Sequence, residues 1–244
     1  MTVPQVVAHR GSSAIHPDNS WAAFEAAVAE GADAIECDVQ ATRDGALIIR
    51  HDLWLGDRLV SELRTAEIGT AEPDVILLAD VLDWAAHVKV GLLVEIKEPE
   101  AADAVGAMVA ASAACDRIVV GGFHGPALAA VKASRRAIRT SLMIGSVLGG
   151  DELVRVAAAY RVDGVHLCWE ARAPRPHRLL GPGLIERLRR ASLEITLWHE
   201  EREDELRALV ALEPDAICTN TPAVLRRIVD ARRARSAAVT EATK

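Results

Sequence analysis

One short run, Ala34-Ile35-Glu36-Cys37-Asp38-Val39, alternates apolar residues with two carboxylates. Short apolar runs of this kind favour a buried strand, and successive side chains of a strand point to opposite faces. Glu36 and Asp38 are two residues apart, so both carboxylates lie on the same face. Ile35, Cys37 and Val39, which alternate with the carboxylates, then face outward, beneath covering helices. The run therefore predicts a strand of a helix-covered parallel sheet that carries two acidic groups on its other face.

Similar runs alternate with Ala- and Leu-rich helical stretches from end to end of the 244-residue chain. Eight strand–helix units without a break favour a closed barrel over an open sheet. We therefore expect an α/β fold, the (β/α)8 TIM barrel, for which this length is normal. The expected strands are Val3–Ala8, Ala34–Val39, Leu92–Ile96, Ile118–Gly122, Thr140–Ile144, Gly164–Cys168, Ile195–Trp198 and Ala216–Thr219. The expected helices include Trp21–Glu30, Ala101–Ala114, Pro126–Ser134, Asp151–Tyr160, Pro182–Ala191, Glu203–Leu212 and Pro222–Arg233.

No internal linker interrupts this pattern, so residues 1–244 are expected to form a single barrel domain. The tail from about Ala234 to Lys244 has no apolar stripe and is expected to fray. Two segments break the alternation: Ala46–Arg50 is an extra extended run, and Leu53–Leu78 is mixed, with a helix expected around Ser61–Glu67. In a barrel both segments would lie at the C-terminal rim, where the loops after the strands build active sites.

The charge of the chain restricts its partners. The formal net charge is -7 and the pI is near 5.6, which argues against nucleic acid or an anionic membrane as the main partner. Residues 1–8 lack the features of a signal peptide, and no apolar run is long enough to span a bilayer. We therefore expect a cytoplasmic protein without stable membrane association. An acidic protein that binds an anion needs a local cation or a small Arg/Lys cluster.

A third carboxylate is expected beside the first two. In Leu92-Leu93-Val94-Glu95-Ile96-Lys97, Glu95 and Lys97 share a strand face by the same alternation. Carboxylates gathered late in barrel strands are costly unless a cation neutralises them. Glu36, Asp38 and Glu95 offer only oxygen ligands, which suit one hard cation, Mg²⁺ or Ca²⁺, better than zinc. The alternative is that they form salt bridges with neighbouring Arg or Lys side chains.

Two histidines flank this cluster in the expected barrel. The first strand ends in Ala8-His9-Arg10-Gly11, and His51 follows the extra extended run. Arg is a bidentate phosphate binder, and His titrates near neutrality. A lone His at a strand end is more often structural. Two of them beside a carboxylate-held cation can serve as base and acid in phosphoryl transfer.

In this order, the motifs resemble those of the glycerophosphodiester phosphodiesterase family, and the resemblance covers essentially the whole chain. The matching residues are Val7–Gly11, Pro17–Ser20, Ala22–Phe24, Gly31–Gln40, Thr42–Gly45, His51-Asp52, Leu77–Leu82 and Val94–Lys97, with weaker matches at Gly122-Phe123, Leu197-Trp198 and Asp215–Pro222.

The resemblance implies a barrel of the phospholipase C-like phosphodiesterase type. It also implies an enzyme that hydrolyses a small-molecule glycerophosphodiester to glycerol 3-phosphate and an alcohol. The residue roles that it implies are an acid–base pair, His9 and His51; ligands of one divalent cation, Glu36, Asp38 and Glu95; phosphate contacts, Arg10 and Lys97; and a glycerol contact, Trp198.

The chain departs from the family pattern at several positions near the expected site. Asp18-Asn19-Ser20 replaces the usual Glu-Asn-Thr and keeps a helix-capping side chain, and Leu53–Asp57 replaces an Arg-Thr-Thr element, which affects contacts with the alcohol. Trp198 is followed by His199-Glu200-Glu201 rather than Thr-x-Asn. The final Thr-Asp is Thr219-Asn220, which alters a partner behind the site. Because His199 alternates away from Trp198, we expect it to point outward.

Two other functions fit the same motifs. One is a phospholipase that acts on an intact lysophospholipid or a related lipid diester; the sequence shows no aromatic-rich or basic docking loop, which counts against it. The other is a catalytically silent barrel that binds phosphodiesters. All the polar positions that the resemblance requires are present, which counts against a silent barrel.

Overall fold

Eight parallel strands of the described chain close into a barrel, as the sequence predicts. The computed structural model describes residues 3–181 and 183–242, with side chains of the last helix described as far as Arg235. The first strand pairs with both the last strand and the second, and this double pairing closes the barrel. The barrel strands are β1 Gln5–His9, β2 Ala34–Ala41, β7 Gly91–Ile96, β8 Ile118–Gly122, β9 Arg139–Ile144, β10 Gly164–Cys168, β11 Glu194–Trp198 and β12 Ala216–Thr219.

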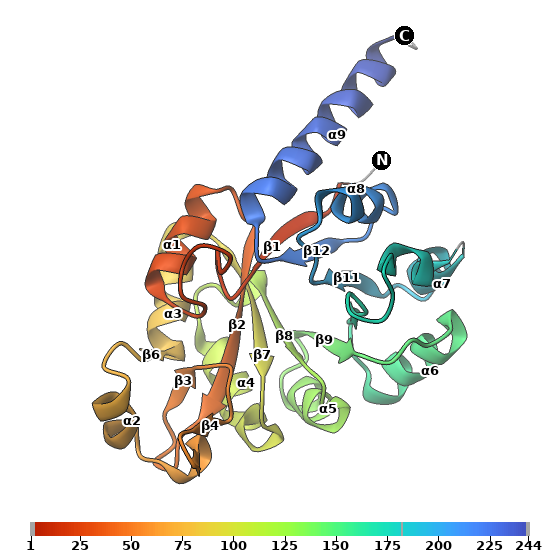
Figure 1. The fold of residues 1–244 in the computed structure, drawn as a ribbon. Helices are drawn as coiled ribbons and strands as arrows, with labels where there is room; N and C mark the ends of the chain where they lie inside the picture. The colour runs from red at the N-terminus through yellow and green to blue at the C-terminus, as the bar shows by residue number, and fades with distance from the viewer. Residues whose placement is uncertain (1–2, 182, 243–244) are drawn as a thin grey trace.

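Helices surround the barrel (Figure 1). Their bounds are α1 Trp21–Ala29, α3 Leu78–Val88, α4 Ala102–Ala111, α5 Gly125–Ser134, α6 Gly150–Tyr160, α7 Leu184–Arg190, α8 Glu203–Ala211 and α9 Pro222–Ala242, with 3-10 turns η2 Pro99–Ala101, η3 Cys115–Arg117 and η4 Pro176–Leu180. None of the described helices combines the length and apolar character needed to cross a bilayer.

Two helices differ from expectation. Helix α3 was not predicted, although its buried residues Leu78, Val81, Leu82 and Ala85 follow helical spacing. Helix α9 extends away from the barrel (Figure 1) and continues past the expected end into the segment expected to fray. The last two residues of that segment, 243–244, lie outside the described residues, as does Pro182, the expected start of the helix Pro182–Ala191.

A small layer is inserted after β2. Strands β3 Leu47–Ile49 and β6 Ile76–Leu77 extend the sheet with antiparallel pairing, and β4 Trp54–Leu55 pairs with β5 Arg58–Leu59. The helix expected over 61–67 is instead the 3-10 turn η1 Val60–Glu62 followed by α2 Thr65–Ala71. Helix α2 begins at Thr65 because Asp44 accepts the Thr65 N–H (2.9 Å) and the Glu67 carboxylate accepts the Arg64 N–H (2.9 Å).

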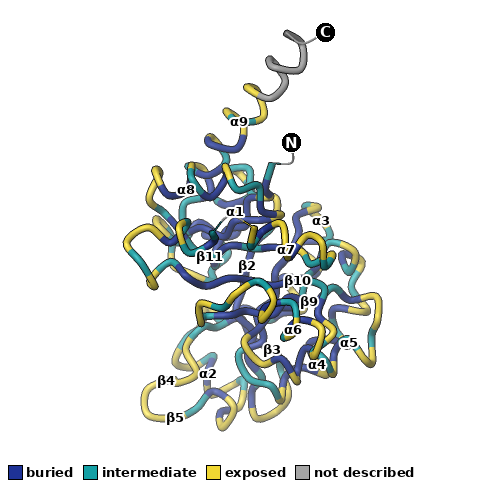
Figure 2. The backbone as a smooth tube through the Cα atoms, turned by 90° about the vertical axis from the view of Figure 1, so that its right-hand side faces the viewer, coloured by how far each residue is buried: buried dark blue, intermediate teal, exposed yellow. Residues whose placement is uncertain are grey.

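The core has two layers, one on each side of the barrel wall. Ile35, Cys37 and Val39 belong to the larger cluster, between strands and helices, as the alternation predicts. A smaller cluster of Val7, Leu93, Met143, Cys168, Ala216 and Cys218 brings together residues of five barrel strands. Figure 2 shows the strands as the buried part of the chain and the connecting loops as its most exposed part. Polar side chains on the inner face of the strands therefore need partners inside the barrel.

Candidate active site

The site begins where β1 ends. Arg10 (φ +55°) and Gly11 (φ +85°) turn the chain sharply, and this turn directs the Arg10 N–H to the Glu36 Oε2 (3.0 Å). A Cβ atom on Gly11 would lie 2.6 Å from the carbonyl carbon of Ala23 in α1, so glycine is required both by the backbone angle and by space. The turn thus fixes His9 and Arg10 beside the second strand.

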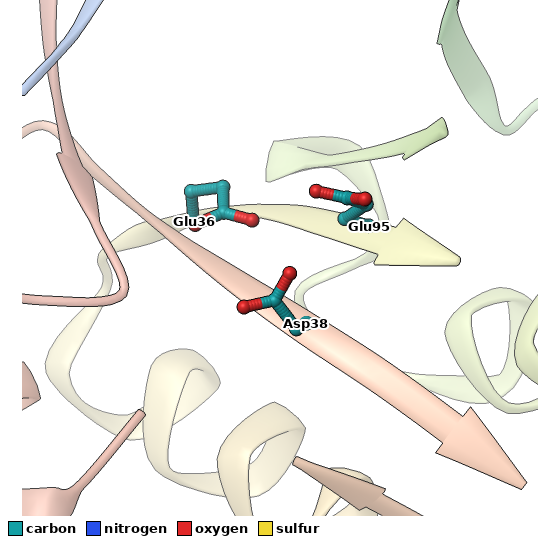
Figure 3. Close-up of side chains that lie close together, drawn as sticks. All are labelled: Glu36, Asp38 and Glu95. Atoms are coloured by element: carbon teal, nitrogen blue, oxygen red, sulfur yellow. The ribbon is translucent and has the colours of Figure 1, made fainter. Parts of the chain in front are cut away.

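The three predicted ligands converge as expected. Glu36 and Asp38 extend from β2 and Glu95 from the neighbouring β7, with their carboxylates turned toward one another (Figure 3). Each residue offers an oxygen within 4.8 Å of the others, and all three are at most 1% exposed. Burial together with the neighbouring Asp38 and Glu95 carboxylates raises the pKa of Glu36 well above its ordinary value. Burial and Asp38 also raise the pKa of Glu95 to about 7.

Salt bridges neutralise this cluster only in part. Lys97 Nζ lies 3.2 Å from Asp38 Oδ1 and 2.9 Å from Glu95 Oε1, and Arg10 Nε lies 3.1 Å from Asp38 Oδ2. Although burial opposes it, the charges of Lys97 and Arg10 hold the pKa of Asp38 below its usual range. Arg10 also pairs with Asp18 (3.0 Å).

Two basic side chains therefore face three buried carboxylates. Within the described chain no Lys or Arg side chain forms a salt bridge with Glu36, and its Oε1 is buried without a hydrogen bond. The cluster is short of positive charge. This deficit, together with an all-oxygen ligand set, fits a hard divalent cation held by Glu36, Asp38 and Glu95.

His9 is buried next to this cluster. Its Nδ1 lies 2.7 Å from the Asn220 Oδ1, and because an amide oxygen only accepts, Nδ1 carries the hydrogen. Its Nε2 has no hydrogen-bond partner in the described chain and lies 3.9 Å from Glu36 Oε2. Burial, with the neighbouring His199 and Arg10, lowers the pKa of His9 to about 3. His9 is thus a neutral imidazole with a free lone pair at the cluster.

His51 is more exposed than His9. Its side chain is 38% exposed, and its Nδ1 lies 2.8 Å from the Asp52 carboxylate. The Gln40 amide holds this loop by donating to the carbonyl oxygens of Arg50 and Asp52, each at 2.8 Å. Arg10 and His51 line a common groove of about 650 Å³. Arg10, the residue next to His9 in the sequence, thus lies on the groove that His51 lines.

Trp198 is at the centre of a group of rings. Its ring centroid lies 5.3 Å from that of His9, 5.5 Å from His166 and 6.1 Å from Phe123. Its Nε1 and both ring nitrogens of His166 are buried without a hydrogen-bond partner in the described chain. His166 is fully buried, and burial lowers its pKa to about 3. Trp198 therefore offers a free donor beside His9.

The expectation for His199 was wrong. Its ring stacks on that of His9, with centroids 4.6 Å apart and an interplanar angle of 16°. Strand β11 ends at Trp198, so the two-residue alternation does not extend to the next residue. His199 therefore lies next to His9 and does not point outward as strand alternation predicts.

Three supporting residues are not among the predicted site residues, although Asn220 was expected to alter a partner behind the site. The Asn19 amide donates to Asp38 Oδ2 (2.8 Å), Gln40 holds the His51 loop, and Asn220 orients His9. Gln40 continues the alternation of Glu36 and Asp38 by two residues, so the same rule could have found it. Asn19 and Asn220 reach the site from loops, for which no period applies.

Comparison with known proteins identifies the family. A model of the glycerophosphoryl diester phosphodiesterase family matches residues 9–224. The chain belongs to this family. The match includes all the residues predicted for the site.

Individual relatives agree with this assignment. The probable glycerophosphodiester phosphodiesterase 1 of Mycobacterium tuberculosis is 40% identical over 121 residues, which are 39% of this chain and 43% of that relative, so the similarity spans less than half of its length. The probable glycerophosphodiester phosphodiesterase 2 of the same species is 27% identical across 93% of this chain and 90% of the relative.

Solved structures share the fold. A glycerophosphodiester phosphodiesterase from Agrobacterium tumefaciens superimposes with a TM-score of 0.76 at 24% identity and covers 92% of this chain and 99% of its own. A phosphodiesterase from Oleispira antarctica, in complex with the product sn-glycerol-3-phosphate, gives 0.80 at 21% identity, covering 93% and 97%.

Proposed function

We propose that this chain is a divalent-cation-dependent phosphodiesterase of the cytoplasm that hydrolyses glycerophosphodiesters to glycerol 3-phosphate and an alcohol, with residues 1–244 forming one catalytic domain. The observation that carries the proposal is the buried carboxylate cluster with its deficit of positive charge, beside a neutral His9. Membership of the family and the product bound to the Oleispira antarctica relative support the substrate class.

Glu36, Asp38 and Glu95 would hold the cation. When bound, the cation would supply positive charge that stabilises the phosphate and favours loss of the glycerol hydroxyl proton. Arg10 and Lys97 would contact the phosphate oxygens from the same rim, and Trp198 would pack against the glycerol carbons. Both basic side chains already pair with the ligand carboxylates, so they lie within reach of a phosphate next to the cation.

The two histidines have different environments, which supports different roles. His9, neutral and with a free Nε2, accepts the proton of the glycerol hydroxyl as that hydroxyl attacks phosphorus. His51, exposed and bonded to Asp52, donates a proton to the departing alcohol. A cyclic phosphate forms and water then opens it, with the two proton transfers reversed.

The test is turnover of water-soluble diesters by the purified protein. Glycerophosphocholine, glycerophosphoethanolamine and glycerophosphoinositol should release glycerol 3-phosphate when Mg²⁺ or Ca²⁺ is present. EDTA should abolish the release, and added cation should restore it. Activity that persists after exhaustive chelation would exclude the role of the cation, and binding of these diesters without turnover would favour the silent barrel.

One observation favours the phospholipase alternative. Trp54 is 55% exposed and Phe123 is 49% exposed, each on a segment of the catalytic rim, although the sequence analysis expected no aromatic docking surface. Exposed aromatics can contact acyl chains or a lipid surface. Rates on lysophosphatidylcholine and glycerophosphocholine, compared above and below the critical micelle concentration, distinguish the two substrates. A rate that rises sharply with micelles would support lipid hydrolysis.

A further inference from the structure

A closed circuit of contacts surrounds His9 on the side away from the carboxylates. His9 Nδ1 bonds the Asn220 side chain, the Asn220 N–H donates to Glu201 Oε1 (3.3 Å), and the same Oε1 bonds His199 Nδ1 (2.8 Å). His199 completes the circuit by stacking on His9. The four residues come from the ends of β1, β11 and β12, which are adjacent in the sheet (Figure 1).

The circuit contacts the His9 imidazole at its edge, through Nδ1, and over its face, through the His199 ring. At the edge, the partner is a neutral amide that also accepts from Ser13 Oγ (2.9 Å), and a neutral acceptor binds an imidazole N–H less strongly than a carboxylate does. Over the face, the His199 ring is nearly parallel to that of His9, and Trp198 meets His9 edge-on. The His199 ring therefore limits the tilt that a single hydrogen bond leaves open.

His199 is itself held by the carboxylate of Glu201. Its Nδ1 faces the Glu201 carboxylate, and the hydrogen bond and charge of His199 lower the pKa of Glu201 although burial opposes this. The Glu201 carboxylate next to the site therefore holds the His199 imidazole.

We infer that His199 and Glu201 form a positioning pair that sets the plane of the His9 ring, an inference that rests on the proposed function. His199 acts through His9 and not on the substrate. The consequence is that changes to this pair should alter the chemical step more than substrate binding.

The first experiment separates kcat from KM for a soluble diester. His199→Ala should lower kcat about tenfold, with KM within about twofold, because a misplaced base slows proton transfer. His199→Phe keeps a ring over His9 and should retain most of kcat. Glu201→Gln should lower kcat in the same direction, and the double variant H199A/E201Q should be no slower than H199A alone.

His177 supplies a matched control. Its Nδ1 also bonds a carboxylate, Glu205 (2.6 Å), but the pair joins η4 to α8 outside the site. His177→Ala should leave kcat and KM unchanged. A His199→Ala variant that raises KM at constant kcat, or that matches the wild type in both, would overturn the inference.

A second measurement does not depend on turnover. In the nitrogen spectrum of the histidine rings, wild-type His9 should show a single tautomer protonated at Nδ1, assigned by its loss in His9→Asn. His199→Ala should broaden or shift this signal, and His199→Phe should preserve it. If the wild-type protein hydrolyses no diester, the proposed function is refuted, but the His9 signal can still be measured. A His9 signal that stays unchanged in both His199→Ala and His199→Phe would refute the positioning pair.

Discussion

The two ends of the barrel use carboxylates in opposite ways. At the N-terminal end, Asp33, Asp163 and Asp215 each directly precede a strand and accept a backbone N–H from the neighbouring strand, those of Val6, Thr140 and Ile195, at 2.7–2.8 Å. Asp163 also pairs with Lys132 (2.7 Å), and Asp33 with Arg226 (3.2 Å).

At the C-terminal end, Glu36, Asp38 and Glu95 approach one another instead of separate donors. Their residual negative charge has no counterpart in the described chain. The comparison separates acidic residues that accept hydrogen bonds from separate donors, which fits a structural role, from acidic residues that gather next to one another, which fits a functional site. We therefore expect substitutions at the C-terminal end to affect turnover and cation binding, and substitutions at the N-terminal end to affect the free energy of unfolding.

The largest expected effect is on turnover. His9→Ala and His51→Ala should each lower kcat/KM at least about a hundredfold, the usual contribution of a general acid or base. His124→Ala, an exposed rim histidine beside α5, is the control and should change little. Near-wild-type turnover in either of the first two variants would remove that residue from the acid–base pair.

At the opposite end, Asp163→Asn should cost stability and leave activity nearly unchanged. The variant loses the ion pair with Lys132 and weakens the bond to the Thr140 N–H, so the free energy of unfolding should fall by about 1–3 kcal/mol. Urea unfolding and steady-state kinetics measure the two effects. Lost turnover at unchanged stability would contradict the division between the ends.

Glu36→Gln should give the opposite pattern. An amide cannot ionise and can still accept the Arg10 N–H, so the cost of burying this carboxyl beside Asp38 and Glu95 disappears and the cation-free protein should gain about 1 kcal/mol in unfolding free energy. The stabilisation by added Mg²⁺ or Ca²⁺ should disappear, and turnover with it. Thermal melts with and without cation check this, and a less stable variant that still responds to cation would refute it.

The smallest effect is a pH dependence of the response to cation. Because the pKa of Glu95 is raised to about 7 from 4.5, the native state binds more protons than the unfolded state between these values. This carboxyl's contribution to stability therefore falls as pH rises through that window. A cation competes with the proton, so the rise in Tm on adding Mg²⁺ or Ca²⁺ should grow from about pH 5 to above 7. In Glu95→Gln the Tm gain should lose this trend; a wild-type gain independent of pH would argue against binding at Glu95.

Regular periods made most of the fold and the cluster predictable. Alternation along β2 and β7 identified three carboxylates and Lys97, and the barrel followed from repeated strand–helix units. Helix α3 was missed because its four buried residues directly follow a mixed segment, which hid their helical spacing. His199 was misplaced because alternation ends with the strand. Asn19 and Asn220 act from loops, and only the folded chain brings them to Asp38 and His9.

The seam where β1 meets both β2 and β12 has a consequence for synthesis. His9 is made long before its partner Asn220, so a nascent chain carries His9 without the amide that orients it until β12 has been made. Ligand binding and hydrolysis should therefore arise late and together, and a fragment that ends before β12 should have neither.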